Sequence, residues 1–162
     1  MIKLKDILLE SDIFIPRRTG EGRKKRYIAA LHKYIQDYIN NGSKGSLILN
    51  NSPIVELPDD LKHIGHSLDL YGSSIQKLPD NFVVNGSLFI NYTPISKLPD
   101  NLTVGGDLFM NHTRISEIPK NLKVGGNIDV AATPLSEKYE IEDLKKLLPG
   151  VKGNIYYHVP TI

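Results

Sequence analysis

A chain of 162 residues, of which 40% are hydrophobic, is the size of one domain and is too apolar to be a disordered polar chain. It contains no cysteine, which excludes disulfides and thiolate metal sites. The net charge of +2 is unevenly spread, because residues 1–45 hold ten Lys and Arg against five Asp and Glu, whereas residues 46–162 hold ten against thirteen. The first residues lack the apolar core of a signal peptide, and no apolar run approaches the ~20 residues of a membrane span. We therefore expect a cytoplasmic protein without membrane contacts.

Residues 1–44 are predicted to form a basic helical segment. Residues 2–10 favour a short helix, and residues 13–16 favour an extended connector. Residues 21–40 predict a longer helix, because apolar side chains recur there at helical spacing, namely Ile28, Leu31, Ile35, Tyr38 and Ile39. A stack of coils exposes its first apolar coil, so we expect this helix to act as a cap on the repeats that follow.

The same segment carries a cluster of cations that are suited to contacts with phosphates or with an acidic partner. These cations are Arg17, Arg18, Arg23, Lys24, Lys25 and Arg26. The only aromatic neighbour, Tyr27, also fits the apolar stripe of the helix, and a charge run beside a helix is commonly a solvated face. Nucleic-acid binding is therefore the alternative function and not the leading one.

Residues 45–162 are dominated by an internal repeat of about 20 residues, of which SLFINYTPISKLPDNL is one copy. Repeats start near residues 45, 66, 86, 106 and 126, and a closing rung spans residues 153–158. The first apolar positions are 21, 20, 20, 20 and 27 residues apart and are Leu47, Leu68, Leu88, Leu108, Ile128 and Ile155.

The apolar pattern within each repeat predicts a short strand followed by a closed coil. In the strand, the pattern L-x-Φ places both apolar residues on the inner face. The other positions expected to point inward are Ile54, Ile75, Ile95, Ile115 and Leu135, then Leu57, Leu78, Leu98 and Ile118, then Leu61, Phe82, Leu102 and Leu122, and finally Ile64, Val84, Val104 and Val124. Such coils have a core only when they stack.

Two columns of turn residues carry further predictions. Gly86, Gly106, Gly126 and Gly153 precede the strands and are expected to adopt positive φ. A column of hydroxyls is expected to form a ladder that satisfies turn backbone groups between coils, and it consists of Ser52, Ser73, Thr93, Thr113 and Thr133.

A second helix is predicted at residues 136–148, which explains the long step to the last rung. Ser136 is its expected N-cap, acidic residues follow in its first turn, and Pro149-Gly150 terminates it.

The pattern L-x-Φ-x-x-[ST]-x-I-x-x-L-P, over residues 45–135 and 153–157, resembles the short bacterial and viral class of leucine-rich repeat. Ser or Thr stands where the usual ladder carries Asn. With its LPDNLTVGGDL units and closing LPGVKGNIYY, the chain is also similar to repeat proteins encoded by large tailed bacteriophages. The resemblance implies an α/β repeat fold, a parallel-stranded solenoid, and protein binding without catalytic residues. For a phage protein it implies the host cell cytoplasm. A parallel β-helix of similar period is the alternative fold.

The residues between the inward positions of each strand point outward and form the candidate binding surface. Phe89 and Phe109 lie on adjacent rungs and would be costly to expose to water unless a partner covers them. Aromatic residues flanked by Asn and Asp are typical of a protein-binding patch, and the other members are Tyr71, Tyr92, His112, Asp69, Asp129, Asn91 and Asn111. The alternative is that these aromatics only stabilise the sheet or lie under the N-terminal segment.

Enzymatic chemistry is poorly supported. The sequence has no phosphate-binding loop, dinucleotide fingerprint or nucleophile elbow. His63 and His66 have a spacing that could hold a metal, but no Asp, Glu or Cys supports the pair. We therefore expect no catalytic residues, no metal and no cofactor. The chain is predicted to bind a protein, and nucleic-acid binding and a structural role in virion assembly are the alternatives.

Overall fold

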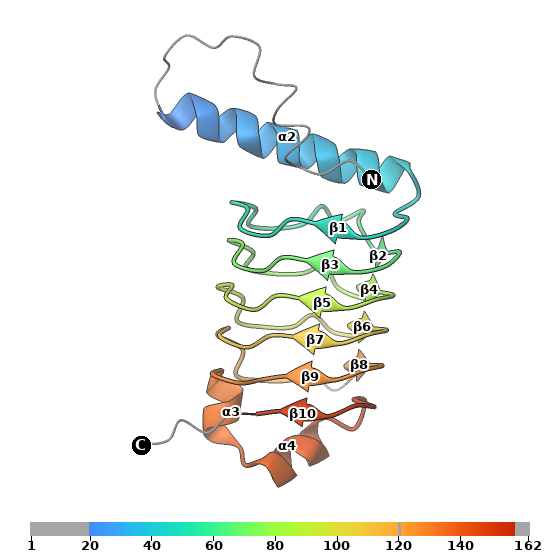
Figure 1. Ribbon diagram of the computed structural model, residues 1–162, viewed down its shortest axis with the longest axis vertical. Helices are drawn as coiled ribbons and strands as arrows, with labels where there is room; N and C mark the ends of the chain where they lie inside the picture. The colour runs from blue at the N-terminus through green and yellow to red at the C-terminus, as the bar shows by residue number, and fades with distance from the viewer. Residues whose placement is uncertain (1–19, 120, 158–162) are drawn as a thin grey trace.

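The computed structural model describes residues 20–119 and 121–157, and it shows a solenoid of stacked parallel strands with one long helix at its first end and two short helices at the other (Figure 1). One sheet has six strands in chain order, β1 (Leu47–Ile48), β3 (Leu68–Asp69), β5 (Leu88–Phe89), β7 (Leu108–Phe109), β9 (Ile128–Asp129) and β10 (Ile155–Tyr156). The strands start at the predicted positions, and the predicted parallel solenoid is confirmed. The sequence-predicted helix at residues 2–10, the connector at 13–16 and the end of the closing rung lie outside the described residues.

Each full coil also contributes a strand to a second parallel sheet, which the sequence analysis did not predict. Its four strands are β2 (His63–Ile64), β4 (Val83–Val84), β6 (Thr103–Val104) and β8 (Lys123–Val124). The second residue of each strand is the Ile or Val that was expected to point inward, and each one is buried. Two parallel strands in one coil are also a feature of the β-helix that the sequence left as the alternative.

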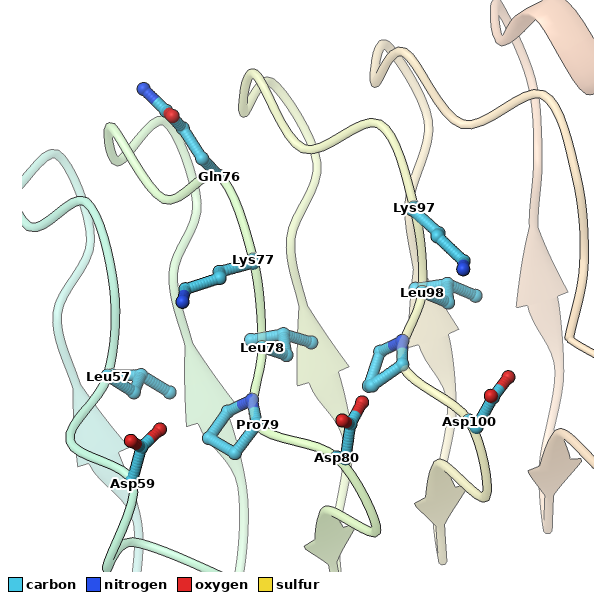
Figure 2. A pocket seen from close by; sticks show the side chains of 11 residues that line it. Leu57, Asp59, Gln76, Lys77, Leu78, Pro79, Asp80, Lys97, Leu98 and Asp100 are labelled. Atoms are coloured by element: carbon cyan, nitrogen blue, oxygen red, sulfur yellow. The ribbon is translucent and has the colours of Figure 1, made fainter.

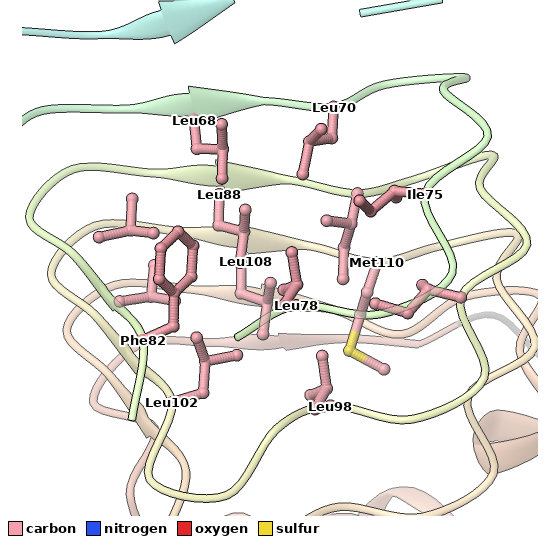
Figure 3. Close-up of a cluster of buried hydrophobic side chains, with 14 of the residues drawn as sticks. Leu68, Leu70, Ile75, Leu78, Phe82, Leu88, Leu98, Leu102, Leu108 and Met110 are labelled. Carbon is pink, nitrogen blue, oxygen red and sulfur yellow. The ribbon is translucent and has the colours of Figure 1, made fainter. Parts of the chain in front are cut away.

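The core runs through the centre of the stack as columns of like side chains (Figure 3). Nearly all the predicted inward residues are buried, and Phe82 is the largest of the fully buried side chains. Ile118 and Ile155 are the exceptions, because they are only partly buried where they pack against the core. Every coil buries its apolar residues against its neighbours, so the coils stabilise one another.

The buried hydroxyl column does not link the coils as predicted. The hydroxyls of Thr93, Thr113 and Thr133 donate to carbonyls three residues earlier in their own coils, at 2.6, 2.7 and 2.6 Å. This local bond is available to Ser and Thr in any tight turn, and here it takes precedence over a bond to the next coil.

A different polar column links the coils. The side chain of Ser67 accepts a hydrogen bond from the backbone N–H of Ser87 at 3.1 Å, and the same contact recurs along the stack. The acceptor side chains are Ser46, Ser67, Ser87, Asp107 and Asn127, each of which is bonded by the N–H one coil further on.

The glycines before the strands do not have positive φ, which corrects the sequence prediction for Gly86, Gly106, Gly126 and Gly153. Their role is close packing between coils. A Cβ at Gly86 would lie 2.8 Å from the backbone of His66, and a Cβ at Gly126 would lie 3.0 Å from that of Gly106. Glycine is therefore needed for backbone approach and not for an unusual dihedral angle.

Helix α2 (Gly20–Asn40) lies across the β1 end of the stack, as predicted for the cap (Figure 1). Leu31 and Ile35 are fully buried against the first coil, and several tyrosines pack beside them. Ile28 was also expected in this stripe, but it is only half-buried and does not join the core.

A tyrosine hydroxyl on α2 forms hydrogen bonds with the backbone of the first coil. The Tyr38 hydroxyl lies 2.7 Å from the carbonyl oxygen of Ser43 and accepts from the N–H of Gly65 at 3.1 Å. Burial is the main cause that raises the pKa of both Tyr34 and Tyr38. The cap therefore covers apolar side chains, and the Tyr38 hydroxyl adds a second contact to a Gly65 N–H that already donates to the Ser43 carbonyl.

The C-terminal helical region consists of two short helices instead of the single helix predicted for residues 136–148. Helix α3 (Pro134–Lys138) begins after Thr133, which is its N-cap, and Ser136 is the third residue of a capping box. Helix α4 (Ile141–Leu147) follows after a break and ends before Pro149. The proline at position 134 fits the first helical turn, so the helix starts two residues earlier than predicted.

Candidate protein-binding face

The outward side chains of the six-stranded sheet form a central row in which two aromatic residues lie between two acids. The strand register pairs Asp69 with Phe89, Phe89 with Phe109, and Phe109 with Asp129. The two phenyl rings are stacked, with centroids 4.9 Å apart and planes 5° from parallel. Phe89 and Phe109 are half-buried, which is less exposed than the sequence predicted, because each ring covers a face of the other.

A second aromatic row runs beside the first. Tyr92 stacks on His112 with ring centroids 4.4 Å apart and planes at 17°, and Tyr71 contacts Tyr92 at 5.5 Å in a tilted arrangement. Tyr71 is 41% exposed and Tyr92 is 51% exposed. The two rows bring together the five aromatic and imidazole rings that the sequence assigned to this surface.

Backbone strain is located in the second row. Tyr92 and His112 have φ of 59° and 56°, in the left-handed region, as do the equivalent residues Asn51, Gly72 and Ala132. Asn and Gly adopt this conformation readily, whereas a larger side chain costs roughly 1 kcal/mol or more. This feature was not predicted from the sequence, although Asn51 and Gly72 in the same column are a signal for it.

The two asparagines of the site contribute less surface than the alternation predicted. Asn91 and Asn111 are half-buried, and their Oδ1 atoms are buried without a hydrogen-bond partner among the described residues.

The two acids of the central row are fixed by short-range hydrogen bonds. The backbone N–H of Tyr71 donates to Asp69 Oδ1 at 3.0 Å, and the N–H of Ala131 donates to Asp129 Oδ1 at 3.0 Å. Burial raises the pKa of Asp69, and the hydrogen bond from Tyr71 partly opposes that effect. Because a carboxylate can accept about four hydrogen bonds, each acid keeps capacity for another donor.

The basic cluster lies elsewhere, on the first half of α2. Arg23, Lys24, Lys25 and Arg26 are exposed, and none of them forms an ion pair with another residue in the described part of the chain. Arg17 and Arg18 lie outside the described residues.

An open groove runs along the side of the coils where the Leu-Pro-Asp turns follow one another (Figure 2). Carboxylates of Asp59, Asp80 and Asp100 alternate along it with the ammonium groups of Lys77 and Lys97. Opposite charges are interleaved there, and Lys77 also forms an exposed ion pair of 3.2 Å with Glu56. The groove is lined by buried leucines and by charges of both signs, so no single sign of charge is available there to select a ligand.

The histidine pair that was considered for a metal does not gain further ligands. Nδ1 of His66 lies 3.2 Å from the hydroxyls of Ser46 and Ser67, and His63 is exposed on β2. Within residues 20–119 and 121–157, no group of three or more His, Asp or Glu side chains is placed to hold a metal ion. The same residues contain no helix long and apolar enough to cross a membrane.

Comparison with known proteins adds no assignment. No protein-family model matches the chain, and no curated protein matches it.

Proposed function

We propose that the chain is a non-catalytic protein-binding module whose outward strand face, centred on Phe89, Phe109 and Tyr92, is the binding surface. The single observation that carries this proposal is the pair of adjoining aromatic rows on a rigid parallel sheet, with Tyr71 41% and Tyr92 51% exposed. Exposed tyrosines beside a stacked aromatic core are typical of interface hot spots, because they offer large contact areas at low entropic cost.

The strained backbone supports the same proposal. Tyr92 and His112 occupy left-handed positions where Asn or Gly would be cheaper. Their stacking recovers only ~0.5–1.5 kcal/mol, which is comparable to the cost of the backbone conformation. Large rings at these positions therefore bring little stability to the free protein, and a binding role accounts for them.

We also propose that the repeat belongs to the leucine-rich class, on the motif of residues 45–135. We further propose that the chain is a bacteriophage protein that acts in the host cytoplasm. A host protein is then the expected partner. A structural role in the virion is the competing assignment, and recovery of the chain from purified particles would favour it.

The proposal is tested by affinity capture from cells of the native host, followed by reconstitution with the purified captured protein. Tyr92→Asn and His112→Asn together remove the second aromatic row while placing a residue at each position that tolerates positive φ. We expect partner affinity to fall roughly tenfold or more, since these rings are hot-spot candidates.

The matched control is Ala132→Asn, which makes the same backbone-compatible change at the equivalent position outside the aromatic rows. It should leave affinity unchanged. Equal affinity of the double variant and the control would show that the aromatic rows are not the binding surface.

A second candidate function, contact with nucleic acid or another polyanion, is favoured by the position of the basic cluster. Arg23, Lys24, Lys25 and Arg26 lie in the first two turns of α2, at the positive end of the helix dipole, where cations are electrostatically unfavourable. Binding to duplex DNA that weakens steeply with salt and is lost on neutralising these four residues would support this function.

A further inference from the structure

The outward strand face has a charge pattern that its aromatic residues alone do not explain. Asp69 and Asp129 lie on either side of the Phe89–Phe109 pair in the central row. No Lys or Arg occurs among the outward residues of strands β1 to β10 in the six-stranded sheet or at the two positions that follow each described strand. The face is therefore locally acidic on a chain whose net charge is +2.

Both acids are held in place, and both remain available for a ligand. Each carboxylate accepts one backbone N–H at 3.0 Å through its Oδ1 atom, and neither forms an ion pair with a described residue. Asp69 is half-buried beside an aromatic residue, so its charge is poorly solvated in the free protein. A cation placed against it would offset that cost.

The spacing of the acids sets the form of the ligand. Three rung-to-rung steps of ~4.8 Å separate Asp69 from Asp129, which is about 14 Å. An extended peptide rises ~3.4 Å per residue, so residues i and i+4 span about 14 Å and point to the same side, together with residue i+2. In an α-helix the same length takes about nine residues, and residues i and i+9 point to opposite sides.

We propose that this row binds an extended, basic protein segment with the pattern basic–x–apolar–x–basic, lying along the solenoid axis. The two basic side chains pair with Asp69 and Asp129, and the central apolar side chain packs on Phe89 and Phe109. The inference rests on the proposed function and specifies the partner's chemistry. Arginine is the preferred basic residue, because its guanidinium pairs bidentately with a carboxylate and also stacks on aromatic rings.

The test uses the full chain and synthetic peptides, with binding followed by NMR titration so that weak affinities are measurable. The probe peptide has an arginine–threonine–phenylalanine–threonine–arginine core, whose threonines favour an extended backbone. A permuted peptide of identical composition places the second arginine at i+3, on the opposite side. We expect the permuted peptide to bind roughly tenfold more weakly, because only one carboxylate can then be reached.

Protein variants give the complementary measurement. The double variant Asp69→Asn with Asp129→Asn keeps the Oδ1 acceptors and removes two charges. It should lower the affinity for the probe peptide roughly tenfold and make that affinity less dependent on salt. The control, Asp80→Asn with Asp100→Asn, removes the same charge from exposed turns outside the strand face and should have little effect. Equal affinity of the wild-type protein for the probe peptide and the permuted peptide would overturn the inference. Equal affinity of the two double variants for the probe peptide would also overturn it.

The failure of this inference is distinguishable from that of the proposed function. If the probe peptide does not bind while capture of a host protein still requires Tyr92 and His112, the face binds a protein of different chemistry and the inference alone is wrong. Binding of a neutral oligosaccharide such as cellohexaose to the Phe row, without binding of the peptide, would likewise overturn it.

Discussion

Replacing Tyr38 with Phe removes one oxygen from the junction between the cap helix and the first coil without changing the packing volume. In the wild-type protein the hydroxyl lies 2.7 Å from the Ser43 carbonyl oxygen and 3.0 Å from that of Gly45, and it accepts from the N–H of Gly65 at 3.1 Å. The hydroxyl has one hydrogen, which the two carbonyl oxygens share, and its oxygen accepts one hydrogen bond from Gly65.

The expected loss of stability follows from these contacts. Gly65 N–H also donates to Ser43 O, and His66 N–H donates to Gly45 O, each at 2.8 Å, so no backbone group is left unpaired in the variant. Two hydrogen bonds at ~0.5–1.5 kcal/mol each give a loss of about 1–3 kcal/mol in the free energy of unfolding. Truncating Leu31 to Ala in the same helix should cost more, about 2–5 kcal/mol, because that side chain is only 1% exposed.

Urea unfolding followed by circular dichroism measures the effect, and the midpoint should fall by roughly 0.5–1.5 M for a slope near 2 kcal/mol per M. Burial is the main cause that raises the pKa of Tyr38 above the ordinary tyrosine value of 10.0, so the neutral phenol favours the folded state. That contribution is fully present below about pH 10 and is lost as the pH rises through the folded-state pKa. The Phe variant should therefore lose less stability than the wild type above pH 10.

The control for this prediction is Tyr157→Phe, which removes a hydroxyl bonded at 3.2 Å to the exposed Glu140 and should change stability by less than ~0.5 kcal/mol. If Tyr38→Phe has the same urea midpoint as the wild type, the hydroxyl does not secure the cap and the account of the N-terminal end is wrong.

Three further predictions concern the coils and the acidic row. Gly105→Ala should cost about 1–3 kcal/mol in thermal unfolding, because its Cβ would meet Asn85 O of the preceding coil, whereas Gly22→Ala on α2 meets nothing and should be stabilising. Thr113→Val should lower the free energy of unfolding by about 1 kcal/mol, because the 2.7 Å bond to Met110 O is lost. Ser73→Ala should cost almost nothing, because the buried Ser73 hydroxyl has no partner in the described chain, and equal losses in urea titrations would contradict this. Burial raises the pKa of Asp69, so the contribution of its protonated form to the stability of the folded state is complete below about pH 3.8 and is lost as the pH rises. Asp69→Asn should therefore be more stable than the wild type at pH 7 and equally stable at pH 3. A stability difference that stays the same across that range would contradict this prediction.

The repeat made much of the fold predictable. An alternation such as Leu88-Phe89-Ile90 fixes which side chains enter the core, and the 20-residue spacing fixes which strands become neighbours. The adjacency of Phe89 and Phe109 therefore follows from the sequence alone. Helix α2 was equally predictable from its apolar stripe.

The features that sequence reasoning missed depend on contacts between coils. Gly86 looks like a turn glycine, but its role is set by the backbone of the preceding coil. Thr113 was assigned to a ladder between coils, whereas its hydroxyl reaches a carbonyl in its own coil. The half-burial of Phe109 likewise comes from ring stacking, which no alternation pattern specifies. In each case a distance that only the folded chain defines decided the outcome.

The most direct test of the central proposal is the affinity of the purified captured partner for a variant with Phe89→Ser and Phe109→Ser. Loss of the stacked pair should cost the free protein about 1–2 kcal/mol, so circular dichroism must first show that the variant is folded. We predict that partner affinity falls by about thirtyfold, which corresponds to ~2 kcal/mol for a buried aromatic anchor, while neutralising Arg23, Lys24, Lys25 and Arg26 leaves it intact at moderate salt. Unchanged affinity in the Phe variant, together with loss of binding in the neutralised variant, would contradict the proposal and assign binding to the basic helix.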